Sequence, residues 1–277
     1  MRLLAISDLH LSAPHNRAAF AALPASPGDW LIVAGDLCES PNLFAAALEF
    51  LARRFARVIW APGNHELWLS DREAGVGSSQ RKYATLVGIA RQLGVATPED
   101  EFPVWPGGET IVPLMTLYDY SFRPDDVPLA EVVRWAAEFN NVCADERLID
   151  PAPDLGIAEW CAHRCAETEA RLERELPARA RTVLVGHYPL REELVRIPRI
   201  PRFTPWCGTR RTADWPVRYR AVAAVSGHLH VRRTDWRGGT RFDEVSLGYP
   251  RQWDAARGIA AYFREILPGD SAAADRL

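Results

Sequence analysis

Short apolar runs alternate with amphipathic stretches along the first half of the chain. Each run ends in a polar or glycine-containing turn, which is typical of buried strands. The predicted strands of this half are Arg2–Ser7, Trp30–Ala34 and Val58–Trp60. Apolar residues recur at helical spacing over Asn42–Arg54 and Gln80–Leu93, and the second helix is expected to end at Gly94. This alternation of strand and helix indicates a mainly parallel sheet.

The second half contains further strands and one long charged helix. Gly156–Leu176 is its clearest helix, because charged residues line one face. Strands are expected over Thr110–Leu117, Thr182–Val185 and Ala221–Ser226, and as a hairpin over Arg232–Trp236 and Thr240–Val245. Neither a repeat nor a linker divides the sequence. We therefore expect one domain over 1–277, with a helical cap inserted at about 125–178, an arginine-rich loop at 191–211 and a frayed polar tail at 268–277.

Composition and charge narrow the class of protein. Hydrophobic residues make up 48% and charged residues 25% of the 277 positions, as in ordinary globular proteins. No apolar run approaches the ~18 residues of a membrane span, and the N-terminus turns acidic at Asp8 before a signal-peptide core could form. The net charge of −3 argues against a general nucleic-acid binder, and five scattered cysteines suit reduced thiols. We therefore expect a soluble, cytoplasmic protein without a membrane partner.

Polar residues gather directly after five of the predicted strands. In chain order the motifs are Asp8-Leu9-His10, Gly35-Asp36, Gly63-Asn64-His65-Glu66, Gly186-His187 and Gly227-His228-Leu229-His230. Ligands of open α/β sheets bind at the carboxyl ends of the strands, so these turns are expected to meet at one place. Any one motif alone is common in turns and caps, but five together, each at a strand end, indicate a functional site.

The residue types in these motifs are those of a transition-metal site. Carboxylate, imidazole and amide donors suit Mn, Fe or Zn better than Ca, and there are too many donors for one ion. The first ion is predicted to bind Asp8, His10, Asp36 and His230, and the second Asp36, Asn64, His187 and His228. Asp36 would bridge the two ions at about 3.5–4 Å, the spacing that clamps a phosphoryl group during in-line displacement.

In order and composition the five motifs resemble those of the calcineurin-like metallophosphoesterases. The resemblance implies an α/β protein, a four-layer α/β/β/α sandwich of two mixed sheets, with the seven residues above as metal ligands. It also implies hydrolysis of a phosphoric ester, in which a metal-bridging hydroxide attacks phosphorus. Asp36 and His65 match catalytic residues of the family, and His65 would stabilise the transition state or protonate the departing alkoxide.

Segments outside the metal motifs resemble one branch of this family, whose members remove 4′-phosphopantetheine from carrier proteins. These segments are Asp29–Asp36, Val58–Trp68, Leu117–Phe122, Trp206–Thr209, Thr212–Trp215 and Val245–Arg251. The resemblance implies a phosphodiester substrate, with a phosphopantetheinylated acyl carrier protein as partner. Leu37-Cys38-Glu39-Ser40 stands where phosphoprotein phosphatases carry a segment ending in Asp-Arg-Gly, which disfavours that branch. A nucleotide phosphodiesterase, a general phosphomonoesterase and a metal-holding interaction module stay open as alternatives.

Two groups of residues are candidates for substrate contacts. Residues 191–220 contain eight arginines against three acidic residues and lie between the two histidine-bearing strands. Arg210 and Arg211 could steer a phosphodiester or an acidic carrier protein; alternatively, these arginines pair with the acidic cap helices. Tyr118 and Trp206 could wall a slot for a pantetheine arm, whereas aromatic residues at this density more often belong to the core.

Overall fold

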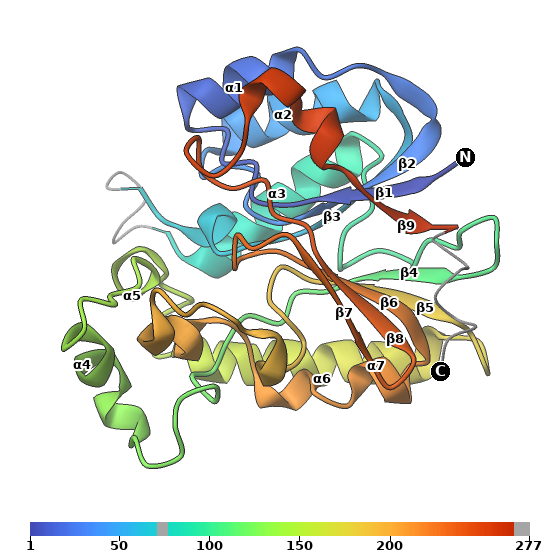
Figure 1. Cartoon of the computed structure of the whole chain (residues 1–277). Coiled ribbons are helices and arrows are strands. Elements are labelled where there is room, and N and C mark those ends of the chain that lie inside the picture. The colour runs from blue at the N-terminus through green and yellow to red at the C-terminus, as the bar shows by residue number, and fades with distance from the viewer. Residues whose placement is uncertain (71–76, 269–277) are drawn as a thin grey trace.

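Two β-sheets lie face to face between two layers of helices (Figure 1). The computed structural model describes residues 1–70 and 77–268. The strands are β1 (Leu3–Ile6), β2 (Ser26–Ala34), β3 (Phe55–Ala61), β4 (Thr110–Pro113), β5 (Thr182–Val185), β6 (Ala221–Ser226), β7 (Arg233–Arg237), β8 (Thr240–Glu244) and β9 (Arg264–Leu267). The four-layer α/β/β/α sandwich that the family resemblance implies is confirmed.

Both sheets are mixed. The first has the order β3-β2-β1-β9, in which β1, β2 and β3 are parallel and β9 is antiparallel to β1. The second has the order β4-β5-β6-β8-β7, in which only β7 runs antiparallel to its neighbour. Three consecutive strands of each sheet, β1 to β3 and β4 to β6, are therefore parallel, so their carboxyl ends lie at the same edge of that sheet.

The alternation of side chains along each strand divides the core into layers. In β1, Leu3 and Ala5 lie in the cluster between the sheets, where they join Val183 of β5. Leu4 and Ile6 point to the opposite face and belong to the cluster that includes Phe44 of α2. Because both faces of these strands are buried, they appear in the sequence as continuous apolar runs.

Helices cover the outer face of each sheet. The α-helices are α1 (Pro14–Ala21), α2 (Pro41–Ala52), α3 (Ser79–Gln92), α4 (Val132–Ala137), α5 (Asp145–Leu148), α6 (Ile157–Glu175) and α7 (Trp215–Arg218). Short 3₁₀ helices are η1 (His65–Leu67), η2 (Leu129–Glu131), η3 (Glu192–Leu194), η4 (Pro201–Trp206), η5 (Arg210–Thr212), η6 (Ala255–Arg257) and η7 (Ile259–Tyr262). Figure 1 shows α1, α2 and α3 over the first sheet, and α6 and α7 under the second.

The structure differs from the sequence prediction at several elements. The strand expected over Thr110–Leu117 ends at Pro113, because its partner β5 ends at Val185 and offers no further pairing. The helix α1 was not predicted, since few of its residues are buried and its apolar pattern is weak. The strand β9 also escaped prediction; it has only four residues, of which two are exposed.

The segment 125–178, expected as a cap, contains η2, α4, α5 and α6. The last of these packs on the second sheet through Trp160, Cys165 and Leu172, whereas α4 and α5 lie beside the strand ends at the lower left of Figure 1. The predicted arginine-rich loop, 191–211, contains η3, η4 and the start of η5. The helices of the described residues include none that is long and apolar enough to cross a membrane. Most of the tail expected to fray, 269–277, lies outside the described residues.

Candidate metal centre

The structure brings all seven predicted ligand residues to one cluster at the strand ends. Asp8 and His10 follow β1, Asp36 follows β2, and Asn64 follows β3 of the first sheet. His187 follows β5 of the second sheet, and His228 and His230 follow β6. The first five of these residues are buried, whereas the two that follow β6 are partly exposed, with 12% exposure for the His230 side chain. Both sheets therefore supply donors to the same place.

The donors expected to bind a first ion face one another closely. Asp8 Oδ1 lies 2.9 Å from His230 Nε2, and His10 Nε2 lies 3.2 Å from the same nitrogen. His10 Nε2 is also 3.9 Å from Asp36 Oδ2. Asp8, His10 and His230 form one of the groups whose ligand atoms all lie within 4.8 Å of one another.

A second set of donors surrounds the other side of Asp36. His187 Nε2 lies 3.2 Å from Asn64 Oδ1 and 3.5 Å from Asp36 Oδ2. His228 Nδ1 is 3.2 Å from the same nitrogen of His187. Because one oxygen of Asp36 lies within 4 Å of both His10 and His187, this carboxylate stands between the two sets.

The electrostatics of the cluster fit a cation. Burial lowers the pKa of His10 to about 3, with a further contribution from His65, and burial also lowers the pKa values of His187 and His228. Neutral imidazoles of this kind have a lone pair for a metal. Burial and the nearby charge of Asp8 raise the pKa of Asp36 well above its ordinary value.

The hydrogen-bond pattern supports the same interpretation. Ring nitrogens of His10 and His230 face each other, as do those of His187 and His228. His228 Nε2 and His10 Nδ1 are buried without a hydrogen-bond partner among the described residues. Nitrogen and oxygen donors that lie this close together could hold metal ions.

Metal binding is expected to release protons. Since the raised pKa of Asp36 keeps this carboxyl protonated at pH values where an ordinary Asp is ionised, an incoming cation must displace that proton. Affinity should therefore weaken as the pH falls. Calorimetric titration of Zn²⁺ in buffers of different ionisation enthalpy, at about pH 6 and about pH 8, measures the number of protons released. Binding enthalpies that are identical in every buffer would contradict this prediction.

The backbone of the ligand turns is strained. Asp8, His10, Asp36, His228 and His230 have φ values of 53°, 41°, 55°, 72° and 55°. Non-glycine residues rarely adopt this left-handed region, and they cluster at functional sites when they do. This left-handed backbone conformation directs each side chain from the end of its strand toward the cluster.

Two glycines allow the strands to approach at the centre. Gly35 has φ +86°, and a Cβ there would lie 2.6 Å from both Gly63 N and His187 Nδ1. A Cβ at Gly227 would collide with the side chains of Ser7 and Asp8. Neither position tolerates a larger residue without displacing a ligand or its neighbour.

Hydrogen bonds from surrounding residues fix the Asp8 carboxylate and the backbone turn that carries Asp36. Asp8 Oδ2 accepts from Ser7 Oγ at 2.6 Å and Ser246 Oγ at 2.7 Å. Glu66, fully buried, accepts from the backbone N–H groups of Asp36 at 2.9 Å and Gly63 at 2.8 Å. Glu66 thus ties together the turns after β2 and β3, a role that its place in the Gly-Asn-His-Glu motif did not reveal.

His65, the predicted catalytic histidine, stands beside the shared carboxylate. Its Nε2 lies 3.7 Å from Asp36 Oδ2, and its Nδ1 lies 2.6 Å from Glu39 Oε1. Burial raises the pKa of Glu39, but its hydrogen bonds to His65 and Ser12 outweigh that effect and lower the pKa to about 2. Glu39 is therefore ionised and can accept a hydrogen bond from His65 Nδ1. Sequence reasoning assigned it no role; its position three residues after Asp36 was the available signal.

Replacing Glu39 by glutamine is expected to lower turnover by about 10–100-fold, the usual worth of a hydrogen bond to a charged group. The metal content should not change, because Glu39 is not among the seven ligands. The measurement is kcat of the metal-loaded enzyme, with Ser12→Ala as control, since that change keeps the contact between Glu39 and His65. Wild-type kcat in Glu39→Gln would show that the contact has no catalytic value.

The predicted substrate contacts have a different environment. Tyr118 and Trp206 are 1% and 0% exposed and lie in a core cluster, where Trp206 Nε1 donates to Glu146. Arg210 forms ion pairs with Glu192 and Asp125, and Arg211 forms one with Asp119. Both arginines are therefore paired with acidic residues, but none of these partners belongs to the helices of the segment 125–178.

Two partly exposed aromatic rings do face the cluster. Trp68 stacks on His65 with ring centroids 3.6 Å apart, and Tyr249 stacks on His10 at 4.3 Å. The two histidine rings lie 4.5 Å apart, so the four rings form a continuous row. The sequence did not predict a role at the site for Trp68 or Tyr249. Both nevertheless lie in segments that resemble the family branch, Val58–Trp68 and Val245–Arg251.

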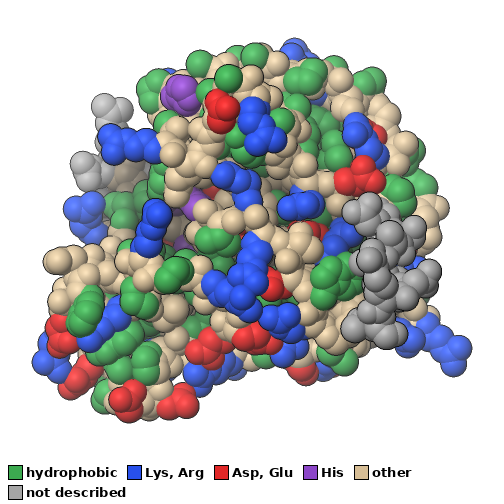
Figure 2. All heavy atoms as spheres, in the orientation of Figure 1, with side chains coloured by type: hydrophobic (Ala, Val, Ile, Leu, Met, Phe, Trp, Pro, Cys, Tyr) green, Lys and Arg blue, Asp and Glu red, His purple; other side chains and the backbone are tan. Residues whose placement is uncertain are grey.

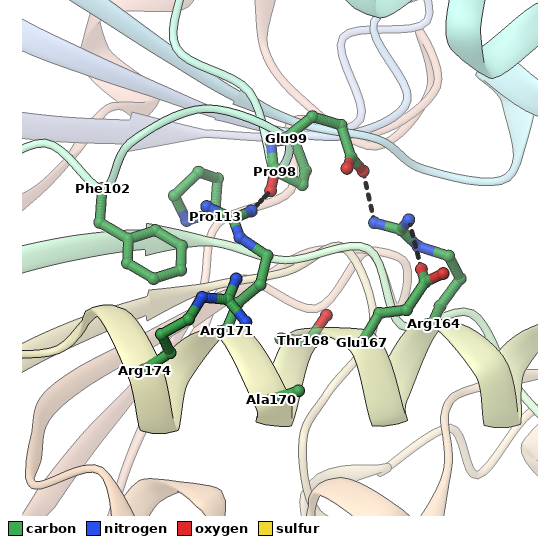
Figure 3. A pocket seen from close by; sticks show the side chains of 10 residues that line it. All are labelled: Pro98, Glu99, Phe102, Pro113, Arg164, Glu167, Thr168, Ala170, Arg171 and Arg174. Atoms are coloured by element: carbon green, nitrogen blue, oxygen red, sulfur yellow. Dashed lines mark hydrogen bonds and ion pairs between the residues drawn. The ribbon is translucent and has the colours of Figure 1, made fainter.

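The cluster is accessible from one face of the molecule. Figure 2 shows histidine side chains inside a hollow of this face, with Lys and Arg side chains around its rim. A separate cavity of about 370 Å³ lies against α6 (Figure 3). Its lining includes none of the seven ligand residues, and its Arg164 pairs with Glu99 and Glu167. The cluster at the strand ends is therefore the candidate active site.

Comparison with known proteins agrees with this geometry. The family model for the calcineurin-like phosphoesterases matches residues 1–232. The chain is 47% identical over 271 residues to the acyl-carrier-protein phosphodiesterase PptH of Mycobacterium tuberculosis, an alignment that covers 96% of this chain and 83% of that protein. The crystal structure of phosphopantetheinyl hydrolase (PptH) from M. tuberculosis matches with a TM-score of 0.90 and 46% identity, covering 97% of this chain and 96% of that one. The chain belongs to the calcineurin-like phosphoesterase family.

Proposed function

We propose that this chain is a phosphodiesterase that removes 4′-phosphopantetheine from an acyl carrier protein with the help of two Mn, Fe or Zn ions. The observation that carries the proposal is the position of Asp36, whose one carboxylate lies between two sets of metal donors. The high identity to an acyl-carrier-protein phosphodiesterase supports the substrate class.

The proposed roles follow from the geometry. One ion would be held by Asp8, His10 and His230. The other would be held by Asn64, His187 and His228. Asp36 would bind both ions. Two such ions lower the pKa of water and neutralise phosphoryl oxygens.

His65 would donate the proton that the departing serine oxygen takes up. Its Nε2 faces the cluster, while its Nδ1 is held by Glu39. The ionised Glu39 can accept a hydrogen bond from Nδ1, which keeps Nε2 directed toward the cluster. Trp68, stacked on the ring, fixes its plane.

The proposed location is the cytoplasm. All five cysteines are free and buried, namely Cys38, Cys143, Cys161, Cys165 and Cys207. Reduced thiols of this kind suit a reducing compartment. A soluble carrier protein in the same compartment would be the partner.

The test is incubation of the metal-loaded chain with a holo acyl carrier protein. Release of 4′-phosphopantetheine and of the apo carrier, followed by mass spectrometry, would support the proposal. Parallel assays use bis(p-nitrophenyl) phosphate and p-nitrophenyl phosphate. Faster cleavage of the monoester, with no release from the carrier, would favour a general phosphomonoesterase. Two bound metals without activity on any ester would favour an interaction module.

A further inference from the structure

We propose that Asp145 is a positioning residue, which orients the side chain of Asn64 toward the second metal and holds Trp68 against His65. This inference rests on the proposed function, because it takes Asn64 as a metal ligand. Asp145 follows none of the strands and belongs to none of the five motifs. It is the first residue of α5, in the segment expected as a cap.

One oxygen of Asp145 decides which way the Asn64 amide points. Asp145 Oδ1 lies 2.9 Å from Asn64 Nδ2 and accepts its hydrogen bond. Because Asp145 Oδ1 accepts this hydrogen bond, its partner must be the amide NH₂ group, since the amide oxygen cannot donate. Asn64 Oδ1 is thereby directed to the opposite side, where it lies 3.2 Å from His187 Nε2. That is the orientation that presents oxygen to a metal ion, since the NH₂ end cannot coordinate one.

The same oxygen also fixes the ring that covers His65. Trp68 Nε1 donates to Asp145 Oδ1 at 2.6 Å. The Trp68 ring stacks on His65 at 3.6 Å with an interplanar angle of 30°. Asp145 therefore acts on a metal ligand and on the proposed proton donor through two hydrogen bonds to a single atom.

The burial of Asp145 favours a functional role for its carboxyl group. The residue is 1% exposed, and its Oδ2 has no hydrogen-bond partner among the described residues. A buried carboxylate oxygen without a partner costs stability, and such groups in native proteins are commonly explained by function. The orientation of Asn64 and Trp68 supplies that explanation.

The chain around Asp145 is anchored to the loop that carries Asn64 and Trp68. Leu69 N donates to Leu148 O at 2.7 Å, just after η1 and at the end of α5. Ser79 N, at the start of α3, donates to Asp150 O at 2.6 Å. These backbone bonds join α5 to the chain on either side of the 71–76 segment, so they hold Asp145 beside Asn64 and Trp68.

The test is metal titration of the full chain after metal removal. Replacing Asp145 by alanine is expected to weaken binding of the second Mn²⁺ or Zn²⁺ by about 10–100-fold, as for other residues that hold a metal ligand in place. Asp145→Asn should restore most of the affinity, because its amide oxygen can accept the same two hydrogen bonds. Circular dichroism and thermal unfolding check that both variants fold.

A matched control lies next to Asp145 on the same helix. Glu146 accepts from Trp206 Nε1 at 2.7 Å and from Tyr120 OH at 2.8 Å but contacts none of the seven ligands. Glu146→Ala should keep both metal affinities. Equal losses in Glu146→Ala and Asp145→Ala would overturn the positioning role, because they would reflect undocking of α5.

The outcomes also separate this inference from the proposed function. Loss of the second ion in Asn64→Ala but not in Asp145→Ala would overturn the positioning role alone. A wild-type chain that binds no metal would overturn the proposed centre, and this inference with it. Weaker binding in Asp145→Ala, with recovery in Asp145→Asn, would support both.

Discussion

Replacing Asp36 by alanine is expected to abolish binding of both metal ions and, with it, hydrolysis. Asp36 Oδ2 lies 3.9 Å from His10 Nε2 and 3.5 Å from His187 Nε2, so the same carboxylate serves both sets of donors. Without the Asp36 side chain, each set keeps only three donors. Both sets also lose the negative charge of the carboxylate that would lie between the two cations. Elemental analysis of the purified variant, beside wild type, measures the loss as metal per chain.

Asp243 provides the matched control for Asp36. It is also a buried carboxylate at 1% exposure, but on β8 it pairs with Arg241 and lies outside the cluster. Asp243→Ala should lower thermal stability and keep both metals. If Asp36→Ala retained two ions per chain, the bridging model would be wrong.

Replacing His65 by alanine is expected to keep both metals and to lower turnover by about 10²–10⁴-fold, the usual contribution of a general acid. The loss should be largest for an alkyl leaving group, which needs the proton, and smaller for p-nitrophenolate, which leaves without one. Comparison of kcat for an alkyl and an aryl phosphodiester measures that difference.

His163 is the control for this prediction, because it is an exposed histidine on α6 far from the motifs in sequence. His163→Ala should behave like wild type.

His65, His10 and Asp36 also form a group of potential ligands. Loss of a metal ion in His65→Ala would therefore assign His65 to the metal site instead of to proton transfer.

The sequence predicted that the seven candidate ligands would lie together because its signals are local. Each ligand follows a buried apolar strand by two to four residues, and parallel strands end at a common edge. The long helix α6 and the strand β5 were predicted almost to their ends for the same reason, since their patterns are strong over a short stretch.

The remaining parts of the site depend on contacts between distant segments. Asp145 meets Asn64 across 81 positions, and no pattern around residue 145 announces a role at the metals. Burial is equally non-local: Tyr118 and Trp206 have the residue type of a binding wall, but packing against Tyr188 and Ala136 places them in a core cluster. Sequence alone identifies such residues only as aromatic.

The left-handed backbone of the ligand turns has a consequence for how this protein could evolve. Each non-glycine residue held there costs about 1–2 kcal/mol relative to glycine, which adopts the same φ freely. Selection for thermal tolerance alone would therefore favour glycine at positions such as 10, 36 and 228, and each such change would remove a metal donor. Heat resistance and catalysis compete for the same backbone positions, so a heat-adapted relative that keeps its chemistry must gain stability elsewhere in the molecule.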